Sequence, residues 1–95
     1  MAGIMETNKL FPFMYKGSAA LNFDEIVEAG FYRVAGQSYT NTPQPALYGV
    51  LLVFKDNVSY LTQVLISVLA SAGVWVRSGS FTDNNYGDWK RLTFG

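Results

Sequence analysis

A nearly unbroken apolar run, LYGVLLVF, occupies positions 47–54 of the chain. A run of this length, rich in branched and aromatic residues, is typical of a strand in the middle of a sheet. Turn-forming residues bound it, with Pro43 and Pro45 before it and Lys55-Asp56-Asn57 after it. We therefore expect a β-sheet in which this segment is a central strand covered on both faces.

Shorter segments on both sides of this run predict further strands. Residues 31–34, 74–77 and 89–94 are strand-like and are separated by turn residues. Residues 58–69 fit two patterns, because alternating β-branched residues suit a strand whereas leucines spaced by four suit a helix. The β-branched content and the turn just before this segment favour the strand.

Residues 22–29 are the part of the chain that we expect to be helical. Asn22 is a good N-cap, and Glu25 stands three residues later, where a capping box places an acid. Gly30 follows at the position where a left-handed residue ends many helices. The predicted fold class is therefore α+β and mostly β, a small antiparallel sheet with one short N-terminal helix.

The length of 95 residues suits one domain rather than two. Residues 11–15 are aromatic and apolar with Pro12 inside, which indicates an edge strand or a packed arm. We therefore divide the chain into an N-terminal arm, residues 1–16, and a β-rich domain, residues 17–95.

Composition argues against catalysis and against several classes of partner. The chain has no histidine and no cysteine, so it lacks the commonest general base, thiolate nucleophiles and two common metal ligands. Seven basic and seven acidic residues cancel, and no basic cluster points to nucleic acid. The longest apolar stretch, residues 64–76, is shorter than the roughly 20 residues of a membrane helix. We expect no enzyme, cofactor, metal, nucleic acid or membrane insertion.

A low content of charge points instead toward assembly. Charged residues make up 15% of the chain, against about a quarter in an average soluble domain. A surface with few charges has little to keep it monomeric, so part of it is expected to be buried against another copy or chain.

Two catalytic or metal-binding interpretations of the acids have simpler alternatives. Asp24, Glu25 and Glu28 can form part of a glycosidase-like carboxylate pair, but they also suit the start and exposed face of a helix. Residues 83–88 echo the first half of a calcium loop, but the acid that completes such a loop is missing. We favour the helix and an Asn/Gly-rich turn.

Several short segments form a pattern when they are taken in their order along the chain. They are AGFYRV at 29–34, YGVLLV at 48–53, Gln63, VWVR at 74–77, and Trp89 with the Lys-Arg-Leu that follows it. In this order they resemble the knob domain of R-type pyocin tail fibres and of phage tail-fibre and appendage proteins. The match runs from about residue 17 to residue 94, and the aromatic segment 11–15 has no counterpart in it.

The resemblance implies a non-enzymatic component of a trimeric phage or phage-like tail fibre. Such a component belongs to the virion, acts outside the host cell and lies at or near the host-contacting end. We therefore expect a structural, receptor-facing module that forms a homotrimer and has a bacterial surface glycan as a candidate ligand. The alternative is a monomeric carbohydrate-binding module that uses aromatic residues in its loops.

The candidate ligand-binding residues lie in or beside the predicted loops. Aromatic rings can stack on a pyranose, and side chains with amide or carboxylate groups can hydrogen-bond its hydroxyls. The alternative is that the aromatic residues complete the core, which we favour for Trp75 and Trp89. The candidates are Tyr39, Phe81 and Tyr86 for stacking, and Asn41, Asp83 and Asn85 for hydrogen bonding.

Arg33 and Arg77 lie on predicted strands between apolar neighbours. They either line a subunit interface, grip an acidic glycan, or pair with an acid such as Asp56 or Glu28 at the sheet edge. We favour the pairing, because a strand arginine usually turns its charged end toward water or a partner.

Overall fold

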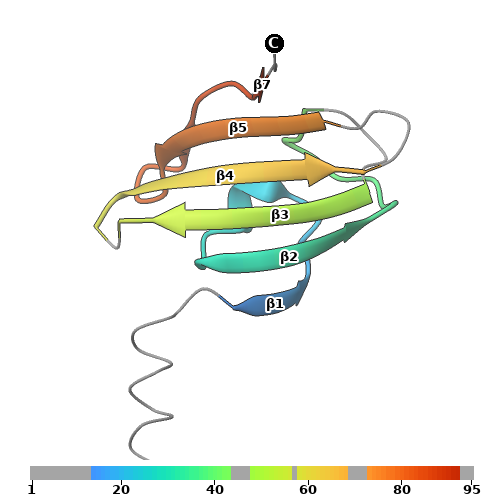
Figure 1. Cartoon of the computed structure of the whole chain (residues 1–95). Helices are drawn as coiled ribbons and strands as arrows, with labels where there is room; N and C mark the ends of the chain where they lie inside the picture. Colours follow the sequence, from blue (N-terminus) through green and yellow to red (C-terminus); the bar gives the residue numbers. More distant parts are fainter. Residues whose placement is uncertain (1–13, 44–47, 57, 69–72, 93–95) are drawn as a thin grey trace, which may run out of the picture.

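The computed structural model describes residues 14–43, 48–56, 58–68 and 73–92, which form one seven-stranded sheet with a single helical turn against it (Figure 1). The fold is thus mostly β, as predicted. The elements are β1 (Tyr15–Ser18), the 3-10 turn η1 (Phe23–Glu25), β2 (Gly30–Ala35), β3 (Tyr48–Lys55), β4 (Tyr60–Ser67), β5 (Gly73–Ser80), β6 (Asn85–Tyr86) and β7 (Lys90–Leu92).

The strand order follows the chain from β1 to β5, and β6 and β7 both pair with β5. Strands β2 to β5 form successive antiparallel pairs, as predicted. β1 is parallel to β2, so the prediction of a wholly antiparallel sheet is wrong at this edge. The connection between the parallel pair crosses one face of the sheet and carries η1 (Figure 1).

The central strands lie where the sequence predicts them. The apolar run at 47–54 contains β3, and the ambiguous segment at 58–69 contains the strand β4. β1 includes Tyr15 and Lys16, which the sequence analysis assigns to the arm. Most of the predicted arm, residues 1–13, lies outside the described residues.

The predicted helix at 22–29 is wrong, because only Phe23–Glu25 is helical, as one 3-10 turn. Its N-cap is as predicted, since the Asn22 side chain accepts a 3.0 Å hydrogen bond from the Asp24 amide. The turn ends early because the Gln63 side-chain amide donates to the backbone carbonyls of Phe23, at 2.7 Å, and Ile26, at 3.0 Å. The Phe23 carbonyl also accepts from the Ile26 amide at 3.2 Å, which closes the 3-10 turn, whereas the Ile26 carbonyl, which a longer helix would use for its own hydrogen bonds, accepts from Gln63.

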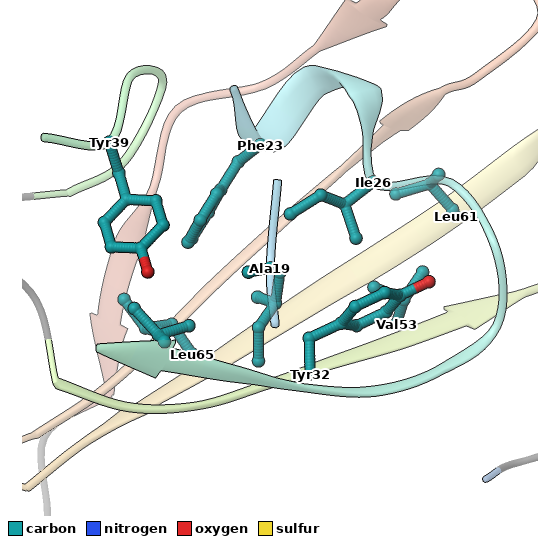
Figure 2. Close-up of a cluster of buried hydrophobic side chains, with 10 residues drawn as sticks. Ala19, Phe23, Ile26, Tyr32, Tyr39, Val53, Leu61 and Leu65 are labelled. Atoms are coloured by element: carbon teal, nitrogen blue, oxygen red, sulfur yellow. The ribbon is translucent and has the colours of Figure 1, made fainter. Parts of the chain in front are cut away.

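The hydrophobic core lies between the sheet and the segment that contains η1 (Figure 2). Phe23 and Ile26 point from this segment onto Leu61 and Leu65 of β4, which lie beside Val53 of β3. Because side chains alternate along each strand, these strand residues share one face of the sheet. The core therefore covers that face alone.

Candidate functional site

Arg77 on β5 is the most deeply buried charged residue of the described chain, with 5% of its side chain exposed. It faces Gln63 on β4, and the Arg77 Nε–H donates to Gln63 Oε1 at 2.7 Å. Its Nη2 lies 2.8 Å from Asp24 Oδ1. Arg77 therefore pairs with Asp24 of the helical turn, and the predicted partners Asp56 and Glu28 are wrong for this arginine.

Gln63 connects the sheet to the segment that carries Asp24, the acid that pairs with Arg77. Its amide group anchors the carbonyls of Phe23 and Ile26, and its carbonyl oxygen accepts from Arg77. Because Asp24 follows Phe23 directly, this anchoring brings the Asp24 carboxylate over β5. The buried polar groups of the helical turn and the sheet thus depend on one another.

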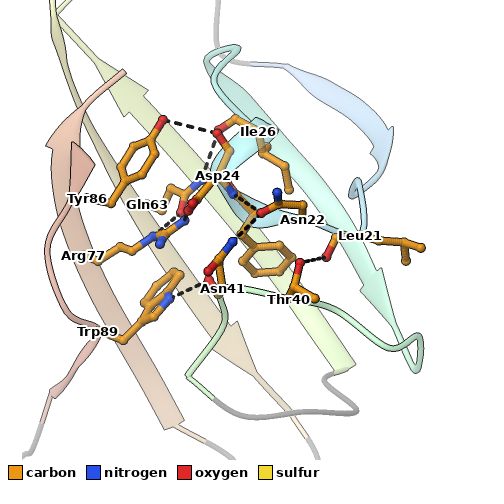
Figure 3. Close-up of polar contacts among 11 residues, drawn as sticks. Leu21, Asn22, Asp24, Ile26, Thr40, Asn41, Gln63, Arg77, Tyr86 and Trp89 are labelled. Atoms are coloured by element: carbon orange, nitrogen blue, oxygen red, sulfur yellow. Dashed lines mark hydrogen bonds and ion pairs between the residues drawn. The ribbon is translucent and has the colours of Figure 1, made fainter. Parts of the chain in front are cut away.

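Two aromatic rings enclose the guanidinium (Figure 3). The Arg77 guanidinium lies 4.7 Å from the centre of the Tyr86 ring and 5.0 Å from the centre of the Trp89 ring. Hydrogen bonds to backbone carbonyls hold both rings in place. Tyr86 Oη donates to the Asp24 carbonyl at 3.3 Å, and Trp89 Nε1 donates to the Asn41 carbonyl at 2.9 Å. Cation–π contacts of this kind are strongest where water is excluded.

Gly79 makes room for the strand that carries Tyr86. A side chain at position 79 would place its Cβ 2.5 Å from Tyr86 Cα and still closer to the Asn85 carbonyl oxygen. Because Gly79 has no side chain, β6 can pair with β5 at this point and set the Tyr86 ring beside Arg77. Burial, with the nearby Asp24 carboxylate, raises the pKa of the Tyr86 hydroxyl, and Arg77 opposes this rise.

A hollow of about 350 Å³ opens beside this cluster, and we call it the amide hollow. Asp24 and Arg77 lie at its base, and Tyr86 and Trp89 line its sides. Three amide side chains, a hydroxyl, a carboxylate and one glycine complete its lining. These residues are Asn41, Asn84, Asn85, Thr42, Asp88 and Gly87.

The structure brings three of the six predicted ligand residues together, since Asn41, Asn85 and Tyr86 all line the amide hollow. Tyr39 is buried instead: its ring packs 5.4 Å from that of Phe23, and its hydroxyl accepts from the Ala35 amide. Its ring is therefore part of the core and not a platform for a sugar.

The remaining two candidates, Phe81 and Asp83, lie outside the lining of the amide hollow. Phe81 packs against the core, and the Lys55 ammonium lies 5.0 Å from the centre of its ring. Asp83 Oδ2 accepts a hydrogen bond from Ser80 Oγ within the turn that joins β5 to β6.

Sequence reasoning considered Arg77 as a contact for an acidic glycan and Asp24 as a catalytic carboxylate, but it included neither among the predicted ligand residues. The sequence held a signal for the burial of Arg77, because Gln63 and Arg77 are polar residues that interrupt the apolar alternation of two neighbouring strands. Asp24 gave no such signal, since an acid at the start of a predicted helix needs no further explanation.

The second candidate surface is the side of the sheet that faces away from the core, which we call the open face. The prediction that residues 47–54 are covered on both sides is wrong within the described chain, because Val50 and Phe54 are 38% and 48% exposed. The registers of β1 to β5 and β7 place twelve large apolar or aromatic residues on this face. They are Tyr15, Phe31, Tyr48, Val50, Leu52, Phe54, Tyr60, Val64, Ile66, Val74, Val76 and Leu92.

Few charges interrupt the open face. Among the described strand residues on this side, Arg33, opposite Val50, and Lys90, opposite Val76, carry charge. Arg33 is exposed, and no acid stands at a strand position of this face in the described chain. With strands about 4.8 Å apart, the six strands β1 to β5 and β7 make a patch roughly 24 Å wide.

In the described part of the chain, no three histidine, cysteine, aspartate or glutamate side chains gather as a metal site would require. Nor does any described helix have the length and apolar character needed to cross a membrane. Comparison of the chain with models of protein families, with curated proteins and with solved structures found no match.

Proposed function

We propose that this protein is a non-enzymatic module of a phage or phage-like tail fibre, which assembles as a homotrimer and faces the host receptor. The observation that carries this proposal is the open face. A contiguous apolar patch of this kind on a small domain marks a surface that is buried against a partner. The order of sequence segments that resembles the pyocin knob supports the fibre as the setting.

We propose a second and a third copy of the same chain as the partners that cover this face. A net charge of zero removes long-range repulsion between copies. The branched apolar rows Val50–Ile66–Val74 and Leu52–Val64–Val76 offer the flat, alternating surface that packed sheets use. Three copies around a threefold axis would bury their open faces inward.

The geometry of the sheet suits a receptor-facing role for the opposite side. Arg77 and the amide hollow lie on the face that also carries the core, so assembly through the open face leaves the hollow accessible. Three hollows on one trimer would present three equal sites, and such multivalency raises weak affinities into useful avidity.

Molar mass in solution tests the proposal. Light scattering over a range of concentrations is expected to give three times the 10.5 kDa mass of the chain. The double substitution Val50→Glu with Ile66→Thr should give monomers, because the glutamate breaks the apolar face while standing opposite Arg33 in the ladder.

Val58→Glu is the matched control, since Val58 is 74% exposed and lies before β4, away from the rows of the open face. This variant should remain trimeric. A wild-type chain that is monomeric at every concentration would overturn the proposal. So would a Val50→Glu/Ile66→Thr variant that keeps its sheet by circular dichroism and stays trimeric.

The monomeric carbohydrate-binding module is the second candidate, and the amide hollow is the observation that favours it. The same mass measurement separates the two candidates. A monomer that binds sugar would support the module, whereas a trimer would support the fibre.

A further inference from the structure

We infer that the amide hollow binds a neutral carbohydrate ring, and that it does so through the hydroxyl groups of the sugar rather than by aromatic stacking. The inference rests on the receptor-facing part of the proposed function and names the class of ligand. It does not depend on the open face, which lies on the other side of the sheet.

The size of the hollow suits one small ligand. Its volume of about 350 Å³ lies at the lower end of the range for small-molecule sites. Its base is fixed by the Gln63–Arg77 hydrogen bond and by the Arg77–Asp24 ion pair, so the site is formed before any ligand arrives. A pre-formed site avoids part of the ordering cost of binding.

The charges of the hollow argue against an ionic ligand. Two carboxylates, of Asp24 and Asp88, and one guanidinium line it, which leaves one net negative charge. An anion would be repelled by this excess, and the Arg77 charge that could attract it is already paired with Asp24. A cation attracted by the carboxylates would be repelled by the positive charge of the buried Arg77 guanidinium.

The remaining polar groups favour hydroxyls. Each of the amides of Asn41, Asn84 and Asn85 has both a donor and an acceptor, as a sugar hydroxyl does. At the base, the buried Arg77 Nη2 and Asp24 Oδ1 lie 2.8 Å apart and satisfy each other as an ion pair. The three amides are therefore the groups that are left to exchange hydrogen bonds with the hydroxyls of a ligand.

The aromatic rings are already occupied. Arg77 lies over one face of the Tyr86 ring and one face of the Trp89 ring, and Trp89 also packs edge-to-face on Phe23 at 6.3 Å. These contacts occupy the ring faces that are turned toward the buried guanidinium of Arg77. Selectivity in this hollow therefore comes from hydrogen bonds.

Titration of the full-length, ¹⁵N-labelled protein tests the inference by nuclear magnetic resonance. Glucose, galactose, mannose and N-acetylglucosamine are the probes, and glucuronate and galacturonate are their charged counterparts. At least one neutral sugar should shift the Trp89 indole N–H and the Asn85 amide signals saturably. The matching uronate should bind at least about tenfold more weakly, which corresponds to about 1.4 kcal/mol.

Substitution of Asn84→Gly together with Asn85→Ala should weaken the binding of that sugar at least about tenfold, because it removes two of the three amides. Glycine suits position 84, where the backbone has φ of 53°. Gln37→Ala is the control, since it removes an exposed amide outside the hollow, and it should leave binding unchanged.

Three results would overturn the inference: no shift with any neutral sugar, a uronate that binds more tightly than its neutral counterpart, or unchanged binding by the Asn84→Gly/Asn85→Ala variant. The molar mass of the same samples keeps this outcome separate from the proposed function. A trimer that binds no sugar would contradict the sugar site and support the proposed assembly. A monomer that binds sugar would support the sugar site and contradict the assembly.

Discussion

Gln63 and Arg77 stand directly opposite each other on β4 and β5, and the Arg77 Nε–H donates to Gln63 Oε1 at 2.7 Å. Neither side chain is more than 6% exposed. The pair interrupts an otherwise apolar face of the sheet, and the helical turn closes over it through Gln63. The buried polar pair of Gln63 and Arg77 is therefore also the contact that joins the sheet to the helical turn.

Gln63→Leu should destabilise the fold by about 3 kcal/mol, because it removes the Gln63 partner of the Ile26 carbonyl and of the Arg77 Nε–H and leaves the Phe23 carbonyl only its bond from the Ile26 amide. Urea unfolding followed by tryptophan fluorescence measures this, at one protein concentration because the proposed assembly would couple stability to concentration. Gln37→Leu, at an exposed position, should have little effect. Equal effects of the two substitutions would contradict the role assigned to Gln63.

Asp24→Asn should cost about 3 kcal/mol or more, because it leaves the buried Arg77 guanidinium without a counter-charge. Glu25→Gln removes one negative charge from the next residue of the same turn, where the side chain is exposed, and is the matched control. The difference between their urea midpoints isolates the ion pair. A Glu25→Gln variant as unstable as Asp24→Asn would show that general charge, and not the pair, matters.

Gly79→Ala should destabilise the protein and displace Tyr86, because its Cβ meets the backbone of β6. We expect a loss of about 2 kcal/mol or more, since neither backbone can yield cheaply. At Gly87 a Cβ would lie 3.3 Å from the Ser78 carbonyl oxygen, so Gly87→Ala should cost less. Unfolding curves of the two variants make the comparison, and a tolerated Gly79→Ala would argue against the β5–β6 contact.

Stability should depend on the ionisation of Asp56. Hydrogen bonds from the amides of Val58, Tyr60 and Ser59 lower the pKa of its carboxyl. A lowered folded-state pKa adds stability above the unfolded-state pKa, and this stability is lost as the pH falls through the folded-state value. The difference in urea midpoint between wild type and Asp56→Ala should therefore be largest near neutral pH and shrink in acid.

Asp56→Asn keeps an acceptor oxygen for these amides and removes the charge, so its loss at neutral pH should be smaller than that of Asp56→Ala. A wild-type advantage over Asp56→Ala that stays constant throughout the acid range would contradict this interpretation.

The strands of the sheet are predictable because their signals are local. The apolar run of β3 and the alternation of β4 are each present within about ten residues of sequence. The length of the helical turn is not, because it is set by Gln63, which lies 40 residues from Phe23 in the chain. Propensity at 22–29 favours a helix, and a distant side chain ends it.

The candidate site was predictable only in part for the same reason. Asn41, Asn85 and Tyr86 are polar or amphipathic residues in turns, which sequence patterns recognise as ligand-binding types. The group around which they gather, Arg77, lies on a strand, where the residue type predicts pairing with an acid at the sheet edge rather than burial in the interior. Its burial depends on Asp24, which lies 53 residues earlier, and no local pattern records that distance.

The amides of the hollow lie in turns and on the short strand β6, whereas the apolar rows of the open face are built into the long ladders of β3, β4 and β5. Substitutions at Asn41, Asn84 or Asn85 therefore leave those ladders and the open face unaltered. If the domain has the fibre role proposed above, a lineage carrying it could change the sugar that it binds one exposed side chain at a time, while its surface for assembly stays the same.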